Sequence, residues 1–415
     1  MWPKKPHTLS GRSGRSIFSQ SIRRSIPVVS INRRRLCLRF SSKRLGFMSL
    51  LNLAKQLAEN DLFGMARPAL GNLISLMTQR PNRGSPFYIL WITTYGCNRK
   101  CLHCDWVWSR TSKEDLAREL NEEEQLMLVD QIAKTNTWGV TISGGEPLML
   151  PKIGDILHGL KKAGKRVNLC SNGVLLPRFA QEFHKIKLDS ITVSMDSFRP
   201  AEHDHMRGVP GSFTKTMAGI EAVRSLRGTA KSPRLVIKAV LSANNFREMA
   251  QWVEFFQPYA DAVEFQPIQN NLVHQIKEGE DALLFKPEHE AEFRVLMKDL
   301  AKRWPSFQSP YYQRMADFIF RPGELFDSGE FRCLFLSSFF LEINPYGAVG
   351  SCPGHYVLGN VREKSIQEIW HSLETCEYQK KLRSKDNRCL CWTYNSFLNL
   401  YLLPLYKRSP WIKDP

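Results

Sequence analysis

No apolar run in the chain is long enough to cross a membrane as a helix. The longest apolar stretches, 335–341 and 397–403, are short and interrupted, and no apolar core of a secretory signal is evident. The sequence therefore predicts no transmembrane segment. Ten cysteines in a chain of this kind indicate metal binding in a reducing compartment rather than a disulfide framework, so we expect a cytoplasmic protein.

Acidic residues are absent from residues 1–47, which hold twelve Lys and Arg residues. This segment carries two thirds of the net charge of +18, and residues 48–415 carry only +6. A basic charge confined to one Ser- and Arg-rich segment gives no reason to expect a nucleic-acid partner. The composition of 1–47 fits a disordered leader or a targeting segment. A mis-assigned start is the third interpretation, and it is favoured because Met48 opens an amphipathic helix.

The composition is that of a globular protein, with 43% hydrophobic and 24% charged residues. A length of 415 residues allows two or three domains and a full-sized core. Residues 48–86 are predicted to form an N-terminal helical segment. Its pattern predicts one or two amphipathic helices over 48–80, broken near Arg67–Pro68. We expect their apolar face to dock on the following domain rather than on a membrane.

Strands and helices alternate from residue 87 to about residue 275. Helices are expected from Asn121, where Glu124 completes a capping box, and over 153–163 and 213–226. Six βα units in about 185 residues imply a parallel sheet, and hence an α/β fold with a partial (β/α)6 TIM-type barrel over 87–275. Apolar, β-branched runs predict the six strands at 88–93, 140–143, 167–170, 191–194, 235–241 and 263–265.

The alternation ends near residue 275. Residues 276–330 predict a helical connection, with an amphipathic helix over 286–304. Residues 331–395 are rich in Cys, Gly and Pro, contain a hairpin-like turn at 342–347, and predict a small appended module. The tail, 396–415, begins with an apolar stretch. The preferred interpretation is a helix docked on the barrel, and the alternative is contact with a membrane surface or a lipid.

Polar and Gly-rich clusters follow each of the first five predicted strands. In chain order these clusters begin at Cys97, Ser143, Ser171, Met195 and Ser242. In a βα barrel the carboxyl ends of the strands form the rim on which active sites are built. The positions of these clusters therefore predict an active site at that rim.

The first cluster contains Cys97, Cys101 and Cys104 with C-x3-C-x2-C spacing. An electron-transfer [4Fe–4S] cluster normally takes four cysteines, whereas three thiolates leave one iron able to bind a second molecule. A closed zinc site also needs four ligands. His103 lies inside the loop, but no fourth cysteine is near in the sequence. The spacing therefore predicts a catalytic iron–sulfur cluster rather than a structural zinc site.

The second cluster contains the run Gly144-Gly145-Glu146-Pro147. Paired glycines allow a ligand to approach the backbone closely, and Glu146 would present a carboxylate to a cationic group. Alone, this run is typical of a turn. Here it follows the next strand, about fifty residues after the cysteine loop, and this position makes it a specific signal in combination with that loop.

With these two motifs the chain resembles the radical S-adenosylmethionine (SAM) superfamily over roughly residues 87–270. The resemblance implies that Cys97, Cys101 and Cys104 ligate a [4Fe–4S] cluster and that SAM chelates its open iron. It also implies that the motif 144–147 contacts the SAM amino group. Further residues that the resemblance places near the ribose, methionine and carboxylate parts of SAM are Asn172, Ser194, Asp196 and Arg207. A plain turn is the alternative for the first of these, and a solvated surface arginine for the last.

The resemblance also implies a reaction. In this family a reduced cluster passes an electron to SAM, and the resulting 5′-deoxyadenosyl radical abstracts hydrogen from an unactivated carbon. An electron donor such as a flavodoxin or ferredoxin is implied. The substrate would be a peptide side chain, as in maturases, or a small metabolite. No separate peptide-recognition domain and no cobalamin-binding domain is evident.

Two competing hypotheses remain. One is a non-catalytic iron–sulfur protein that carries electrons, which the run 144–146 disfavours because an electron carrier has no use for a site for the SAM amino group. The other is a radical SAM enzyme that acts on a lipid-type substrate.

The late cysteines resemble the SPASM/twitch extension, which carries an auxiliary iron–sulfur cluster in many radical SAM enzymes. The resemblance covers 331–395. Relatives often end in C-x2-C, whereas this chain has C-x-C, so loss of the cluster with retention of buried cysteines is the alternative. Cys376 is a candidate substitute ligand, and Cys170, inside a strand, is expected in the core. The implied ligands of the auxiliary cluster are Cys333, Cys352, Cys389 and Cys391.

Overall fold

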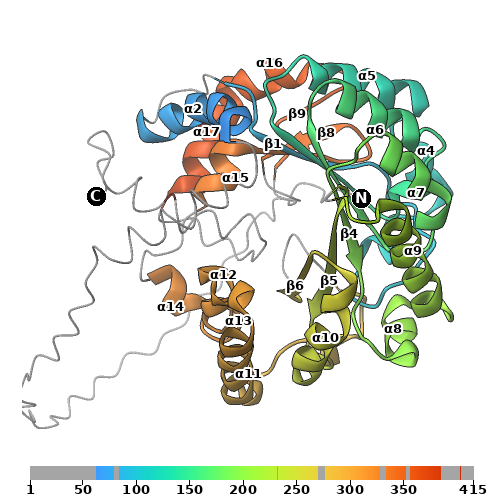
Figure 1. The fold of residues 1–415 in the computed structure, drawn as a ribbon. Helices are drawn as coiled ribbons and strands as arrows, with labels where there is room; N and C mark the ends of the chain where they lie inside the picture. The colour runs from blue at the N-terminus through green and yellow to red at the C-terminus, as the bar shows by residue number, and fades with distance from the viewer. Residues whose placement is uncertain are drawn as a thin grey trace, which may run out of the picture. The chain divides into compact units, whose positions relative to one another are not determined.

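The computed structural model describes residues 62–78, 84–230, 232–269, 276–327, 333–351, 356–384 and 402 (Figure 1). Several predictions lie outside these residues. They concern the leader 1–47, the cysteines Cys352, Cys389 and Cys391, and the apolar stretch of the tail apart from one residue.

The centre of the fold is a parallel sheet of six strands that follow one another in chain order. Each strand pairs with the next in parallel, as in the register Ile89 with Val140. This arrangement confirms the predicted α/β partial barrel, with strand boundaries within two residues of those expected. The strands are β1 Tyr88–Ile92, β2 Gly139–Ser143, β3 Arg166–Ser171, β4 Ser190–Ser194, β5 Arg234–Leu241 and β6 Ala262–Pro267.

Helices connect these strands, and Figure 1 shows α5, α6, α7 and α9 along the outer side of the sheet. The capping box predicted at Asn121 is present, because its side chain accepts from Glu124 N while the Glu124 carboxylate accepts from Asn121 N. The helices are α3 Trp106–Ser109, α4 Lys113–Ala117, α5 Glu122–Ala133, α6 Ile153–Lys162, α7 Leu176–Lys185, α8 Pro200–Arg207, α9 Ser212–Arg227 and α10 Met249–Phe256.

Alternate positions on the strands face opposite sides of the sheet, because side chains in a strand point to the two faces in turn. In β3 and β4 the buried positions, such as Leu169 and Val193, belong to the main hydrophobic core with residues of the outer helices. The partly exposed positions between them, such as Asn168 and Thr192, line a cavity on the inner side. The inner face of β3 and β4 is therefore largely polar.

The C-terminal segment extends the same sheet. Strand β7 (Phe340–Ile343) pairs in parallel with β1, and β8 (Ala348–Gly350) and β9 (Gly359–Asn360) continue it in antiparallel fashion. The predicted hairpin is present between β7 and β8, with Gly347 at a φ of 78°. The segment predicted as an appended module thus shares a sheet with the barrel. Its helices are α15 Leu334–Phe339, α16 Ile366–His371 and α17 Leu373–Arg383.

Residues 276–327 are helical, and the expected amphipathic helix is α11 (Glu290–Arg303), which buries Phe293, Met297 and Leu300. Three short helices follow it. Among them, α12 places Tyr312 against Phe265 of β6, with ring centroids 4.9 Å apart. These short helices are α12 Pro310–Gln313, α13 Met315–Phe320 and α14 Pro322–Asp327.

The expected helix break near Arg67–Pro68 is wrong. Helix α2 runs without interruption through this pair, from Leu62 to Thr78. Proline inside a helix removes one backbone hydrogen bond and costs stability. The second half of α2 offsets this cost by packing, since Leu76 is fully buried in a cluster with residues of α15. In the part of the chain that the structure describes, no helix has the length and apolarity needed to span a membrane.

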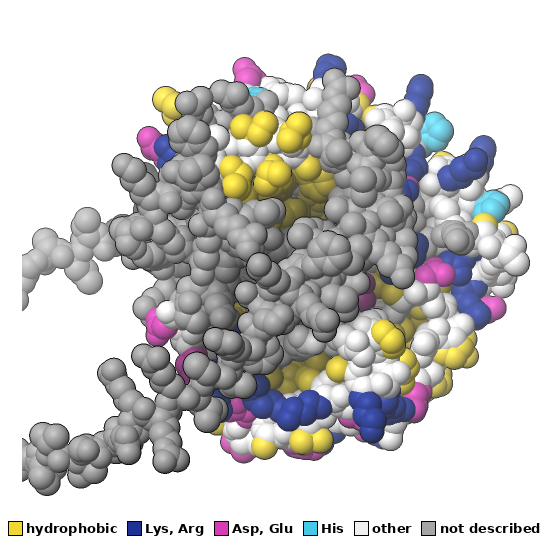
Figure 2. All heavy atoms as spheres, turned by 60° about the vertical axis from the view of Figure 1, so that its left-hand side comes forward, with side chains coloured by type: hydrophobic (Ala, Val, Ile, Leu, Met, Phe, Trp, Pro, Cys, Tyr) yellow, Lys and Arg dark blue, Asp and Glu magenta, His cyan; other side chains and the backbone are white. Residues whose placement is uncertain are grey.

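The surface carries charges of both signs. Figure 2 shows Lys and Arg side chains next to Asp and Glu side chains along the lower edge of the face it presents. Arg247 and Glu292, both about half exposed, form an ion pair 2.7 Å apart.

Candidate active site

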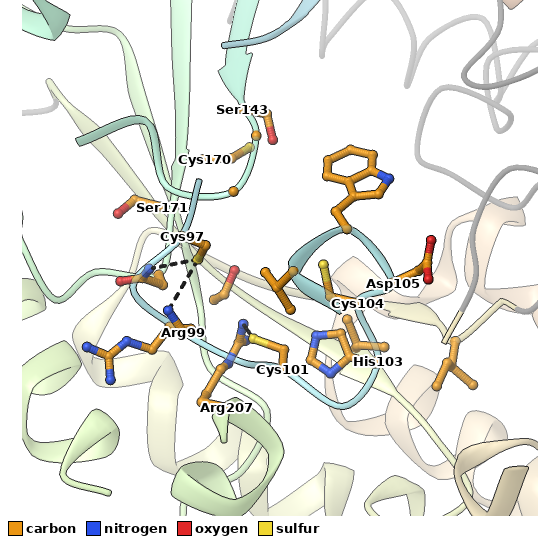
Figure 3. A pocket seen from close by; sticks show the side chains of 18 of the residues that line it. Cys97, Arg99, Cys101, His103, Cys104, Asp105, Ser143, Cys170, Ser171 and Arg207 are labelled. Carbon is orange, nitrogen blue, oxygen red and sulfur yellow. Dashed lines mark hydrogen bonds between the residues drawn. The ribbon is translucent and has the colours of Figure 1, made fainter. Parts of the chain in front are cut away.

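The three clustered cysteines line one cavity. They belong to the loop between β1 and α3, and Cys101 is buried while Cys97 and Cys104 are partly buried. Figure 3 shows Arg207 beside Cys101. The cavity has a volume of about 250 Å³. Of the residues predicted near SAM, it is lined by Gly144, Gly145, Asn172, Ser194 and Arg207.

The end of helix α8 holds the cysteine loop in place. Lys100 N donates to Arg207 O at 2.9 Å, and Leu102 N donates to Met206 O at 3.1 Å. Gly208 ends the helix at a φ of 64°, and a Cβ at this position would lie 2.2 Å from Lys100 O. Only glycine fits so close to the loop in this conformation. The segment that the resemblance associated with the SAM carboxylate therefore also fixes the path of the cysteines.

The backbone of the paired glycines Gly144 and Gly145 lies very close to the backbone that precedes Cys97. Gly145 N donates to Thr94 O at 2.7 Å, and Glu146 N donates to Gly96 O at 2.9 Å. A Cβ on Gly145 would lie 2.2 Å from Gly96 O, and one on Gly144 would lie 2.5 Å from Thr94 O. The glycines therefore let the backbone that leads into the cysteine loop pass directly against the end of β2.

Glu146 is fully buried and joins the ends of β2 and β3. Its carboxylate accepts hydrogen bonds from Ser171 Oγ at 3.0 Å and Asn172 N at 2.8 Å. Burial raises the pKa of Glu146 to about 7, although these donors oppose the rise. The side chains of Glu146 and Pro147 do not line the cavity beside the cysteines. Contact between this motif and the SAM amino group stays a prediction.

Glu119, which the sequence analysis missed, anchors the start of the loop. Its carboxylate accepts from Tyr95 N at 2.6 Å and from Thr94 Oγ1 at 2.7 Å. It lies in the connection after α4, far from both motifs in sequence. No local pattern marks it, because its partners are a backbone amide and a threonine hydroxyl.

Arg207 is buried, so the alternative of a solvated surface arginine is wrong. Its guanidinium lies 2.9 Å from the carboxylate of Asp196, which is fully buried, and 3.6 Å from Cys101 Sγ. Burial by itself would raise the pKa of Asp196, but Arg207, His103, His203 and the backbone amide of Val240 together hold the pKa below its usual range. Asp196 thus orients Arg207, and Arg207 alone of the two lines the cavity.

The three thiols fit an iron–sulfur cluster. Burial raises the pKa of Cys97 to about 12 and that of Cys104 to about 11, and it also raises the pKa of Cys101. Thiolates at these positions therefore need a bound cation to stabilise them. Among the described residues, no three His, Cys, Asp or Glu side chains converge closely enough for a single metal ion. Three cysteines around one cavity without that convergence suit a group larger than one ion.

A second cavity, of about 430 Å³, lies inside the barrel. It shares lining residues with the first, among them Cys170, Ser194 and Arg207. Cys170 was expected in the core, and this expectation is wrong, because its position in β3 faces the inner side of the sheet. Other lining residues that the sequence analysis missed are Thr141, Asn168, Thr192, Lys238, Glu264 and Gln266.

One predicted auxiliary ligand is described. Cys333 is buried directly before α15, in a cluster with Phe87 and Phe340. Cys376, the candidate substitute, is buried in α17. The assignment of the auxiliary cluster to particular cysteines stays a prediction.

The Arg207–Asp196 pair gives a first testable expectation. Replacing Arg207 with Met leaves a fully buried carboxylate without its cation, so we expect a loss of about 3–5 kcal/mol in the free energy of unfolding. The combined change Arg207→Met with Asp196→Asn removes both charges and should recover most of this loss. Anaerobic urea unfolding measures both variants.

The matched control is Arg247→Met, which breaks the pair with Glu292. Both of those side chains are about half exposed, so the expected cost is below about 1 kcal/mol. Equal costs for the two arginine variants would contradict the role assigned to the buried pair.

Comparison with protein families identifies the class of this chain. Residues 91–253 match the Radical SAM superfamily, and residues 333–393 match SPASM, an iron–sulfur cluster-binding domain. The chain therefore contains a radical SAM domain and a SPASM domain. It is an enzyme whose cofactors are a [4Fe–4S] cluster, SAM and an auxiliary iron–sulfur cluster.

Curated relatives carry enzyme names. AdoMet-dependent heme synthase of Methanosarcina barkeri is 28% identical over 73% of this chain and 86% of its own length. Probable GTP 3′,8-cyclase of Methanosarcina acetivorans is 31% identical over 42% of this chain and 51% of its own length. Fe-coproporphyrin III synthase of Methanosarcina barkeri is 29% identical over 32% of each protein. The chain thus spans about half or less of the length of the last two.

Solved structures share the fold. SuiB of Streptococcus suis aligns with a TM-score of 0.57 at 14% identity, over 86% of this chain and 84% of SuiB. The structure of anSMEcpe with bound AdoMet aligns with a TM-score of 0.54 at 17% identity, over 78% of this chain and 94% of that protein. At these identities the likeness shows the fold alone.

Proposed function

We propose that this enzyme cleaves SAM reductively at the cavity beside Cys97, Cys101 and Cys104 and removes a hydrogen atom from a substrate held inside the barrel. The observation that carries the proposal is the meeting of two cavities. The smaller is lined by the three cysteines and the larger by the inward side chains of the strands, and they share lining residues. A reactive group formed in one is thus adjacent to a ligand in the other.

The residues of the chain have separate parts in this proposal. The [4Fe–4S] cluster and SAM, when bound, supply the radical chemistry. Cys97, Cys101 and Cys104 hold the cluster, while Gly144, Gly145 and their partners keep the cysteine loop against the end of β2. Arg207 presents a fixed positive charge to the cavity, which suits the SAM carboxylate.

Asn172 and Ser194 add hydrogen-bonding groups to the same wall. Asn172 Nδ2 already donates to Asn98 Oδ1 at 2.7 Å, so its side chain is oriented before any ligand binds. Asp196 acts through Arg207 and is a positioning residue. This division of roles supports SAM binding at the positions that the sequence predicted.

The electron needed for SAM cleavage comes, in this proposal, from a flavodoxin or ferredoxin in a cytoplasmic, reducing environment. The relatives named heme synthase and GTP 3′,8-cyclase differ in substrate. The name AdoMet-dependent heme synthase supports SAM chemistry, and the substrate must be inferred from the inner cavity of this chain. A peptide side chain and a small metabolite are both compatible with SAM cleavage itself.

Anaerobic reconstitution with iron and sulfide, followed by dithionite and SAM, tests the proposal. We expect 5′-deoxyadenosine and methionine to form in equal amounts, measured by liquid chromatography. A reconstituted cluster that accepts an electron without producing 5′-deoxyadenosine would instead indicate an electron-transfer protein. The electronic absorption of the cluster, recorded before and after dithionite, distinguishes that result from failed reconstitution.

A further inference from the structure

The inner cavity is lined by two opposite charges on neighbouring strands. Lys238 on β5 and Glu264 on β6 are direct neighbours in the strand register, and both line the cavity. Among the described residues, neither side chain forms a hydrogen bond or an ion pair. Adjacent strands lie about 4.8 Å apart, so one ligand group can reach both side chains.

Several of the other polar side chains of this cavity form hydrogen bonds with one another. Asn168 Oδ1 accepts from Thr192 Oγ1 at 3.2 Å, and Tyr88 and Thr141 share a hydrogen bond of 2.7 Å. Ser194 and Gln266 also show no side-chain hydrogen bond among the described residues, but they are neutral, whereas Lys238 and Glu264 are charged. A charged group inside a protein is stable only when it is paired or solvated, so this pair is suited to a ligand that brings both opposite charges.

The opposite wall of the cavity is apolar. It consists of side chains from β1, α15 and β7, on the other side of the barrel from β5 and β6. These strands and this helix meet because β7 pairs with β1. The apolar wall is made by Leu90, Ile92, Leu336 and Phe340.

The charged pair also lies deeper than the residues shared by the two cavities. Val240 and Gln266, two positions further along β5 and β6, line both cavities, whereas Lys238 and Glu264 line only the inner one. A ligand anchored at the pair therefore extends its remaining atoms toward the rim and the cysteine loop.

We propose that the substrate is a small zwitterion with adjacent ammonium and carboxylate groups and an apolar remainder, such as a hydrophobic amino acid. Its carboxylate binds Lys238, its ammonium group binds Glu264, and its apolar part lies against Leu336 and Phe340. This inference rests on the proposed function, because it assumes that the inner cavity holds the substrate. It disfavours a lipid-type substrate, whose long chain would leave the charged pair without partners.

Calorimetric binding to the reconstituted protein, with SAM present, tests this assignment. The probes are L-phenylalanine, 3-phenylpropionate without the ammonium group, and 2-phenylethylamine without the carboxylate, with L-leucine and L-tryptophan as probes of size. We expect L-phenylalanine or one of these two amino acids to bind at least about tenfold more tightly than analogues that lack either charge.

Two variants assign each charge to its partner. In Lys238→Gln the advantage of the amino acid over its amine analogue should disappear, and in Glu264→Gln the advantage over its acid analogue should disappear. Lys215→Gln and Glu288→Gln make the same changes on exposed helical turns and should retain both advantages.

Three results overturn the inference: no binding of any of the three amino acids, equal binding of amino acid and single-charge analogues, or advantages that survive both variants. The production of 5′-deoxyadenosine by the same wild-type sample is recorded in parallel. Since that reaction does not need the charged pair, its presence without amino-acid binding removes this inference and leaves the proposed function intact. Its absence removes the proposed function.

Discussion

Replacing Cys97, Cys101 and Cys104 together with alanine is expected to abolish 5′-deoxyadenosine formation while leaving about four irons per chain, the content of one [4Fe–4S] cluster. The three sulfurs line the same cavity, so their removal leaves the first cluster without any protein ligand there. The auxiliary cluster is predicted to be held by other cysteines, in the SPASM domain, and it should remain. Iron and sulfide analysis of the reconstituted variant measures this difference directly.

The reciprocal variant makes the experiment decisive. Replacing Cys352, Cys389 and Cys391 with alanine should also leave about four irons, but with SAM cleavage retained. The same change at Cys376, buried in α17, should leave the iron content of the wild type. Near-zero iron in the variant of the first three cysteines would show that the late cysteines do not hold a cluster. A large loss of iron in Cys376→Ala would make that residue a ligand.

The sequence was most informative about the strands and the rim. Strands β1 to β6 could be predicted because each is a short apolar run between helix signals, and the register of parallel strands then brings the five polar clusters to one edge. Cys97, Cys101 and Cys104 could be placed at this rim because they follow the first strand. Their spacing is a local pattern, which can be recognised in the sequence without knowledge of the fold.

The face of the sheet on which a side chain lies, and the residues that become its neighbours on adjacent strands, could not be predicted in this way. Cys170 lies inside an apolar run of the sequence and was therefore expected in the core, yet its position in β3 faces the inner cavity. Lys238 and Glu264 are far apart in sequence and become neighbours only through the register of β5 and β6. Helix α2 continues through Pro68 because tertiary packing of its second half outweighs a local penalty.

The paired glycines Gly144 and Gly145 have a structural role beside the ligand contact that was assigned to them. In the sequence, the paired glycines at 144 and 145 indicate the close approach of a ligand to the backbone. In the structure the approaching group is the chain that leads into the cysteine loop, through Thr94 O and Gly96 O. A side chain at Gly145 would therefore act first on the position of Cys97, one residue after Gly96.

Gly145→Ala is accordingly expected to lower the rate of 5′-deoxyadenosine formation by about 100-fold, because displacing a reacting group by about 1 Å has effects of that size. The added Cβ would meet backbone oxygens at 2.2 Å and 2.6 Å, which no side-chain rotation can relieve. The iron content of the first cluster should fall with the rate, whereas the SPASM cluster should be retained. Rate and iron content are measured on the same reconstituted sample.

Gly323→Ala is the matched control, since a Cβ there meets no atom within 4 Å. It lies in helix α14, where alanine is the better helix former, so activity should be unchanged and stability equal or slightly higher. A Gly145→Ala enzyme that keeps the rate of this control would show that the cysteine loop tolerates displacement. The close packing of the ends of β1 and β2 would then have no part in positioning the first cluster.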